Sequence, residues 1–392
     1  MKLKKFFAGV LAAAMMLTVG ATAAFATTAA TDTTATPVTD SFGKTFTKND
    51  KLLLTKNYKV EEGIAPAEEF EFTIDYVGAQ RIDTNVSQPT VNGLKKYAEF
   101  EAVKDSTGLP VNTYRQNFEI NLSDLGISEN GTGIYVYKIT ETDKGTPGVT
   151  YDVDKTTDGD LYMVVTVSHD VDENGVITTP YSYNYSVALR RTKTAPTQAN
   201  GFEVKGTKVS NEKAFNNTYG SSDKVNHLTL TKTVKGNFGD LGKTFTFNVV
   251  LKPAAGKQAK DYAGAVVSAP SDTTQNGKVW AIDGTTVHTV TIGHGDTVTL
   301  TNLPEGVIYV VTEDQTTETP WVYTVTGQTT DTEGDKLVTT TNANNVVSIV
   351  NTHEGTPDMG VVLDNAPYIA MLAIVAIGGV ALMLNKRRRD EE

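Results

Sequence analysis

Two lysines stand where an alternating β-strand would place apolar side chains. In the segment 52–60, Lys56 falls in phase with leucine, tyrosine and valine, and in the segment 228–234 Lys232 falls in phase with leucine and valine. Residues two apart point to the same face of a strand, so both lysines are expected to point inward. Burial disfavours a charged amine and can lower its pKa by about 3–5 units. A buried lysine is therefore either paired with a carboxylate or able to act as a nucleophile.

Glutamate and asparagine residues follow the same pattern further along the chain. Four of them fall in phase with apolar neighbours, although around 307–313 both faces of the strand are apolar: Glu141, Asn217, Glu313 and Asn351. The order Lys, Glu, Asn thus occurs twice, with similar flanking sequences, which indicates an internal repeat. Each repeat is expected to direct one lysine, one glutamate and one asparagine into its interior.

This combination of side chains can react within one chain. A desolvated lysine is a neutral nucleophile, and a desolvated glutamic acid is a proton donor. If the amine faces the asparagine carboxamide, the glutamic acid can polarise that carbonyl and move protons while ammonia leaves. The product is a Lys–Asn isopeptide bond. The alternative is that these side chains reach the rim of the strands and form ordinary salt bridges.

The repeats predict the architecture. Short segments rich in threonine, valine, tyrosine and phenylalanine alternate with turn sequences, which is typical of an all-β protein. Two tandem Ig-like β-sandwiches are expected, at 44–221 and 224–354. A weak helical pattern is present at 91–105. The first repeat is longer, mainly between its glutamate and its asparagine.

Both ends of the chain carry targeting patterns. Residues 1–26 have a basic start, an apolar run and small residues, as in a secretory signal peptide, and 27–43 is expected to be a flexible leader. An apolar segment at 366–384 has the length of a transmembrane helix, and the basic residues after it should stay cytoplasmic. The chain has no cysteine and a net charge of −11, which excludes disulfides and argues against nucleic acid as a partner.

The repeated segments resemble the backbone pilins of Gram-positive bacteria, the streptococcal family with isopeptide-linkage domains. The resemblance is carried by "LTKNYKV" and "LTKTVKG", "KITETD" and "VVTEDQ", and "FNNTY" and "IVNTH". It implies Ig-like domains that each form one spontaneous Lys–Asn bond with a glutamate as catalyst. Carried over by position, the bonds are Lys56–Asn217 with Glu141 and Lys232–Asn351 with Glu313. No cofactor and no enzymatic turnover are expected.

The C-terminal segment 356–392 is similar to a cell-wall sorting signal, in which a sortase cuts a Pro-containing pentapeptide ahead of an apolar helix and a basic tail. The pentapeptide has methionine where threonine is usual: Thr356, Pro357, Asp358, Met359 and Gly360. Backbone pilins pass the resulting acyl group to a lysine of the next subunit. Three lysines before Asn217 are candidates, with Lys208 preferred: Lys205, Lys208 and Lys213.

The expected product is a covalent homopolymer of pilin subunits, anchored to peptidoglycan at the cell surface after the C-terminal helix has held the chain at the membrane. Two alternatives stay open. The chain can be a wall-anchored adhesin or minor pilin at the tip or base of a fibre, or 366–384 can be a plain single-pass anchor.

Other motifs do not support a binding site. The segment 236–244 resembles a phosphate-binding loop but has the wrong glycine spacing and precedes a strand. The segment 170–181 matches only the first half of a calcium loop, so a hairpin turn is expected there. The histidines show no metal-ligand spacing.

Overall fold

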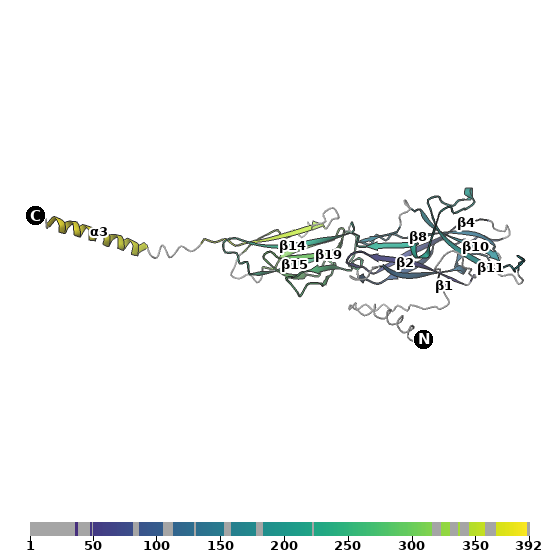
Figure 1. Ribbon diagram of the computed structural model, residues 1–392, viewed down its shortest axis with the longest axis horizontal. Coiled ribbons are helices and arrows are strands. Elements are labelled where there is room, and N and C mark those ends of the chain that lie inside the picture. The colour runs from purple at the N-terminus through teal and green to yellow at the C-terminus, as the bar shows by residue number, and fades with distance from the viewer. Residues whose placement is uncertain are drawn as a thin grey trace, which may run out of the picture.

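The computed structural model describes most of the chain between residues 50 and 356, and a C-terminal helix. The described residues are 36–37, 48, 50–80, 86–104, 113–128, 131–152, 158–177, 183–221, 223–315, 323–329, 336–337, 345–356 and 366–389. The predicted signal peptide at 1–26 lies outside them. The described elements are almost entirely β-strands, as predicted, and form two sandwiches that lie end to end along the long axis (Figure 1).

The first sandwich contains two facing sheets. One sheet has the order β1–β2–β13–β9, with β7 on the other side of β2: β1 (Thr36–Pro37), β2 (Lys51–Val60), β13 (Phe215–Tyr219), β9 (Val149–Thr150) and β7 (Thr113–Asn121). The other has the order β12–β11–β10–β8–β4–β5: β12 (Thr207–Val209), β11 (Tyr183–Thr192), β10 (Asp160–His169), β8 (Gly133–Glu141), β4 (Glu68–Gln80) and β5 (Leu94–Phe100). Apolar side chains from both sheets form one core.

The second sandwich is built in the same way. Its first sheet has the order β17–β16–β19–β14–β23–β21: β17 (Val279–Trp280), β16 (Ala265–Ser268), β19 (Thr297–Pro304), β14 (Val225–Lys235), β23 (Asn345–Thr352) and β21 (Thr324–Thr326). Its second sheet has the order β18–β15–β20–β22: β18 (His288–Gly293), β15 (Thr244–Lys252), β20 (Ile308–Glu313) and β22 (Lys336–Leu337). A separate apolar core fills the space between them.

Short elements complete the described chain. A two-stranded ribbon pairs β3 (Ile64–Ala65) with β6 (Val103–Lys104). The 3₁₀ turns are η1 (Leu122–Leu125), η2 (Gln198–Asn200), η3 (Asn211–Lys213) and η4 (Ala259–Asp261). The predicted hairpin turn near Asp172 is present, because Val171 and Ile177 form a bridge and the Asp172 carboxylate accepts two backbone N–H groups.

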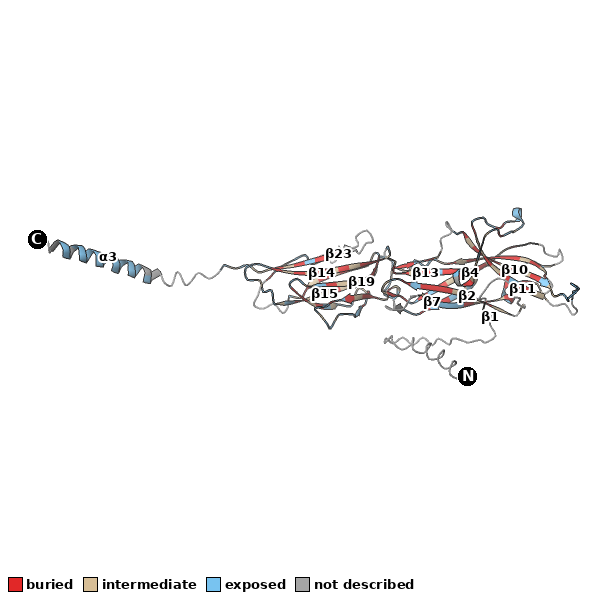
Figure 2. Cartoon of the chain, viewed as in Figure 1, coloured by how far each residue is buried: buried red, intermediate tan, exposed pale blue. Residues whose placement is uncertain are grey.

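The first long strand and the last strand of each sandwich lie side by side and run parallel. In the first sandwich β2 pairs with β13, with Lys56 opposite Phe215 and Tyr58 opposite Asn217. In the second, β14 pairs with β23, with Lys232 opposite Ile349. Buried and less buried positions alternate along β14 and most of β2 (Figure 2). This parallel pairing brings the beginning and the end of each repeat together, which sequence phase alone does not specify.

One prediction about local structure is wrong. The weak helical pattern at 91–105 is replaced by β5, which pairs with β4 and buries Ala98 and Phe100, so pairing with a sheet edge overrides a weak local preference. Within the leader 27–43, Thr36 and Pro37 form β1 and pair with Leu52 and Leu53 of β2. Strand β13 pairs with β2 only from Lys56 onward, so β1 can pair with the start of β2 along the same edge.

A buried asparagine connects the two sandwiches. Asn302, on β19, has a left-handed backbone with φ of 63° and is 1% exposed. Its side-chain amide donates to the carbonyl of Ile64, 3.0 Å away, and its oxygen accepts from the Tyr219 hydroxyl at 2.7 Å. Gly63 lies so close that a side chain there would collide with Asn302. The junction is therefore a packed and hydrogen-bonded contact.

The C-terminal helix α3 (Ala366–Arg389) covers the apolar segment 366–384, and its large apolar side chains are exposed where they are described (Figure 2). Within the described part of the chain, no helix combines the length and the apolarity needed to cross a membrane.

Candidate functional site

The structure brings the three predicted residues of the first repeat together. Lys56 projects from β2, Glu141 from the end of β8 in the opposite sheet, and Asn217 from β13 beside β2. The Lys56 Nζ atom lies 2.8 Å from Glu141 Oε1 and 2.9 Å from Oε2. The Asn217 amide nitrogen donates to Glu141 Oε1 at 2.6 Å. One carboxylate oxygen thus contacts both the amine and the carboxamide.

The second repeat assembles the same set. Lys232 Nζ lies 2.8 Å from Glu313 Oε2, and the Asn351 amide nitrogen donates to Glu313 Oε1 at 2.6 Å. The asparagine again stands two residues beyond the partner of the lysine in the parallel register. In each repeat the glutamate lies opposite a phenylalanine on the neighbouring strand of its own sheet. The partner is Phe247 in the second repeat and Phe72 in the first. All six predicted residues therefore occupy matching positions in two independent cores.

Both sites are closed to solvent. The lysines are at most 1% exposed, the asparagines at most 1%, and the glutamates 7–8%. Phenylalanine rings cover each amine, with centroids 4.6 Å from Lys56 Nζ at Phe70 and 4.2 Å from Lys232 Nζ at Phe245. Water is thereby kept away from the groups that would react.

Burial changes the ionisation of the first site in the direction that the reaction requires. Desolvation lowers the pKa of Lys56 to about 8, against the opposing effect of Glu141. Desolvation also raises the pKa of Glu141, against the opposing effect of Lys56. A low lysine pKa and a high glutamate pKa favour the pair of a neutral amine and a neutral acid, which are a nucleophile and a proton donor.

The first site contains two residues that sequence reasoning missed. The backbone N–H of Asp152 donates to Asn217 Oδ1 at 2.7 Å. The Asp152 carboxylate in turn lies 3.2 Å from the Arg191 guanidinium. A backbone amide is present at nearly every position, so no residue type marks its role in the sequence.

The candidate polymerisation lysines lie on the surface of the first sandwich. Lys208 is exposed on β12, an outer strand of its sheet in the described chain. Lys205 is exposed and lies 3.2 Å from Glu203, and Lys213 is exposed in η3, just before β13. Of the sorting pentapeptide, Thr356 is described and exposed, and 357–360 lie outside the described residues.

No group of histidine, cysteine or carboxylate side chains in the described chain could hold a metal ion. A small cavity lies beside Glu141, and an open groove lies between the two sandwiches.

Comparison with known proteins identifies protein families that this chain resembles. Residues 47–220 match the family described as a Spy0128-like isopeptide containing domain, and residues 226–353 match a domain family of unknown function. A pilin from Streptococcus pyogenes serotype M1 is 28% identical over 376 residues, covering 88% of this chain and 93% of that protein.

Solved pilin structures are also similar to this chain. The major pilin of Streptococcus pyogenes is 22% identical, with a TM-score of 0.46, and the match covers 78% of this chain and 99% of that one. The T-13 major pilin of the same species is 18% identical, with a TM-score of 0.41, and the match covers 78% and 97%.

The repeated site and the family match define the class of protein, which is structural rather than catalytic. Residues 47–220 form a Spy0128-like isopeptide containing domain, and the similarity to a streptococcal pilin over 88% of the chain supports a structural pilin subunit.

Proposed function

We propose that this pilin is the shaft subunit of a sortase-assembled surface pilus, and that each of its Ig-like domains, 44–221 and 224–354, is closed by an isopeptide bond. The bonds join Lys56 to Asn217 and Lys232 to Asn351. The observation that carries the proposal is the double occurrence of one buried lysine, one glutamate and one asparagine in matching registers.

In the proposed reaction the glutamate serves both partners. With the proton on Glu141, the neutral Lys56 amine attacks Cγ of Asn217, and the carbonyl electron pair moves to Oδ1. The glutamate then transfers a proton from the amine to the carboxamide nitrogen, which leaves as ammonia. The same steps apply to Lys232, Glu313 and Asn351. A buried ion pair, whose desolvation cost is several kcal/mol per ion, is replaced by a neutral amide.

The mass of the intact chain tests this reaction. The purified protein should be lighter than its sequence by two ammonia molecules. Glu141→Ala and Glu313→Ala should each restore one ammonia, and the double variant should restore both. Glu61→Ala, which changes an exposed glutamate near the end of β2, is the control and should leave the deficit unchanged. A folded wild-type chain with its full sequence mass would exclude the isopeptide proposal.

The strand arrangement gives the bonds a mechanical role. Lys56 is on the first long strand of its sandwich and Asn217 on the last, and β14 with Lys232 follows shortly after β13. Tension entering at Lys56 can therefore pass through Asn217 to Lys232 and Asn351, and bypass most strands of both sandwiches. Asn351 lies close to Thr356, where the predicted sorting pentapeptide begins.

Polymerisation is the second part of the proposal. The segment 366–384, which the sequence predicts to lie in the membrane, would hold the chain there while a sortase cuts after Met359. A lysine of the next subunit, preferably Lys208, would then take the acyl group. Because an exposed lysine is mostly protonated at neutral pH, the sortase must help to deprotonate it. The last subunit would be passed to peptidoglycan.

A detergent-resistant ladder tests polymerisation. The chain expressed with its native sortases should give covalent multimers in boiled wall extracts, and Pro357→Ala should remove them. Replacement of Lys208, Lys205 or Lys213, one at a time, should identify the acceptor, with the exposed Lys193 as control. A ladder that survives all three replacements would exclude these acceptors. Wall-anchored monomer alone would favour the adhesin alternative.

A further inference from the structure

The two sites differ in what surrounds the asparagine carbonyl. In the first, the backbone N–H of Asp152 donates to Asn217 Oδ1 at 2.7 Å. We propose that this amide is a catalytic hydrogen-bond donor that stabilises the oxyanion formed when Lys56 attacks Asn217, so that the first isopeptide bond forms faster than the second. The inference rests on the isopeptide reaction proposed above.

The donor acts where charge develops. When the Lys56 nitrogen bonds to Cγ, the carbonyl electron pair moves to Oδ1 and gives it a negative charge. A donor already in place stabilises that charge without further reorganisation, and removal of one such donor typically slows a reaction about 10²–10³-fold. When the C–N bond to the leaving nitrogen breaks, the electron pair returns to the carbonyl. Ammonia leaves with the proton that Glu141 has transferred, and no other reactant is needed.

The amide of Asp152 is held in place by its own side chain. The carboxylate accepts from the Arg191 guanidinium at 3.2 Å and from the backbone N–H of Asn216 at 3.1 Å. Arg191 also donates to the carbonyl of Ala214 at 2.8 Å. Ala214 and Asn216 lie just before Asn217 on the same chain segment, so the amide is fixed relative to the carbonyl it serves. Arg191 is therefore a positioning residue.

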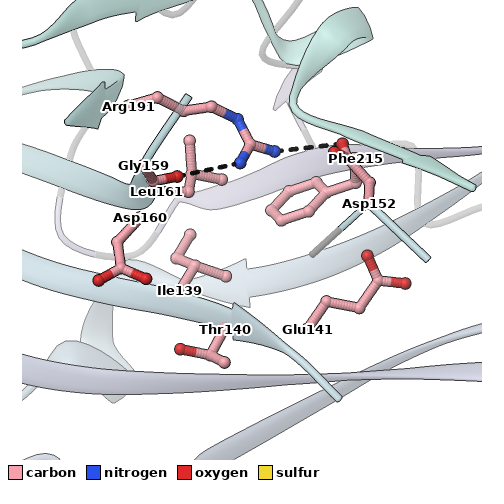
Figure 3. Close-up of a pocket in the computed structure, with 9 residues that line it drawn as sticks. All are labelled: Ile139, Thr140, Glu141, Asp152, Gly159, Asp160, Leu161, Arg191 and Phe215. Atoms are coloured by element: carbon pink, nitrogen blue, oxygen red, sulfur yellow. Dashed lines mark hydrogen bonds and ion pairs between the residues drawn. The ribbon is translucent and has the colours of Figure 1, made fainter. Parts of the chain in front are cut away.

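A small cavity lies beside this arrangement. It measures about 20 Å³ and is lined by Glu141, Asp152, Arg191 and Phe215, among others. Figure 3 shows Arg191 reaching toward Asp152 and Gly159, with Glu141 on the opposite side of the cavity. Space of this size holds about one water molecule. Ammonia is of similar size, so the cavity gives the leaving group a place next to the glutamate.

Among the described residues, the second site has no corresponding donor. Asn351 Oδ1 is buried, and no hydrogen-bond donor reaches it within the described chain. The glutamate, the lysine and the aromatic rings are otherwise equivalent, with contact distances that agree to within a few tenths of an ångström. The second bond therefore serves as an internal reference for the effect of the Asp152 amide.

The experiment measures both bonds during refolding. Full-length chain that has not yet folded is recovered unlinked from inclusion bodies in denaturant, refolded by dilution and quenched at intervals, and each linked peptide is quantified by digestion and mass spectrometry. The first bond should form at least tenfold faster than the second. Equal rates, or a faster second bond, would overturn the proposal. Absence of both bonds would refute the isopeptide reaction itself, which is a different result.

Two variants at one position isolate the N–H group. Asp152→Pro removes both the carboxylate and the N–H, whereas Asp152→Ala removes only the carboxylate. The first bond should form about 10²–10³-fold more slowly in the proline variant than in the alanine variant, with the second bond unchanged. Equal rates in the two variants would overturn the proposal.

Further variants separate catalysis from folding. In a Glu141→Ala background no first bond forms, so the melting temperature there shows whether Asp152→Pro disturbs the fold. If it does, Arg191→Ala replaces it as the test, because loss of the guanidinium that holds Asp152 should slow the first bond. Asp152→Asn with Arg191 intact keeps an acceptor for Arg191 and should retain most of the rate. A first bond that is unaffected by Arg191→Ala would then overturn the proposal.

Discussion

The two candidate sites of this chain share their side chains and differ in their backbone. Lysine, glutamate and asparagine meet at nearly the same distances in both sandwiches, inside equally closed aromatic cores. The first asparagine carbonyl accepts an N–H, and the second is buried without a donor in the described chain. Under the proposed reaction, the side chains define which bond can form, whereas the surrounding backbone controls how fast it forms.

The largest expected effect comes from removing each lysine in turn. By analogy with disulfides, closing a loop of more than a hundred residues stabilises a domain by about 5 kcal/mol, less any strain. Lys56→Ala and Lys232→Ala should each lower the free energy of unfolding of their own domain by an amount of that order, and should add a cavity penalty. Calorimetry and limited proteolysis of the full-length chain would measure the loss domain by domain.

The surface lysines of the same strands are matched controls. Lys59 on β2 and Lys235 on β14 are exposed, so their replacement by alanine should change stability by less than about 0.5 kcal/mol. If the buried and the exposed lysines behave alike, packing alone accounts for the stability of both domains. If only one domain loses stability, only that domain depends on its bond.

Much of the side-chain chemistry could be predicted from the sequence, because the strand period of two links residue type to burial. Lys56 and Lys232 were placed inward by their phase, and both are buried. The contacts of Lys56 with Glu141 and of Glu141 with Asn217 span 85 and 76 residues. The alternation of apolar and polar residues along each strand indicates that these residues face a common core. It cannot show that their atoms come into contact.

The parts that escaped prediction depend on backbone conformation. The Asp152 amide is a backbone group, so no residue type marks it in the sequence. Arg191 contacts the Asp152 carboxylate only because the fold brings the end of β11 next to it. Asn302 is another example, since its left-handed conformation and its hydrogen bonds to the other sandwich arise only when both domains are folded. Strand β5 was missed because pairing with β4 decides its structure.

The junction between the domains decides whether the two sites are independent. Tyr219→Phe would leave Asn302 Oδ1 buried without its hydroxyl donor, which costs about 1–3 kcal/mol. We expect a lower melting temperature for the unfolding step that separates the sandwiches, and unchanged formation of both bonds. Calorimetry of the variant and mass analysis would measure the two effects.

Tyr97→Phe is a suitable control for this change because Tyr97 is 43% exposed. It should leave the melting profile unaltered. If Tyr219→Phe also slowed the first bond, Tyr219 being two residues from Asn217 on the same strand, the junction and the first site would have to be treated as one unit. The comparison between two independent sites would then fail.

The smallest and most specific effect concerns the pH dependence of the first bond. The reactive form has a neutral Lys56 amine and a protonated Glu141, and so holds one proton on the pair. Burial lowers the pKa of Lys56 to about 8 and raises the pKa of Glu141. Above pH 8 the pair loses its proton, and the rate should fall about tenfold per pH unit. At acid pH, below the raised pKa of Glu141, a second proton converts the amine to an ammonium ion and the rate should fall again.

The resulting bell-shaped profile belongs to the pair and to neither residue alone. It is measured by refolding the Glu313→Ala variant, in which each ammonia lost reports the first bond, with folding followed separately by fluorescence. A rate that continues to rise above pH 8 would mean that Glu141 acts as a carboxylate base. In that case the amine would be activated by deprotonation, and the Asp152 amide would be the only group left in the first site to stabilise the oxyanion. The difference between the rates at which the two bonds form would then be larger than the shared side chains suggest.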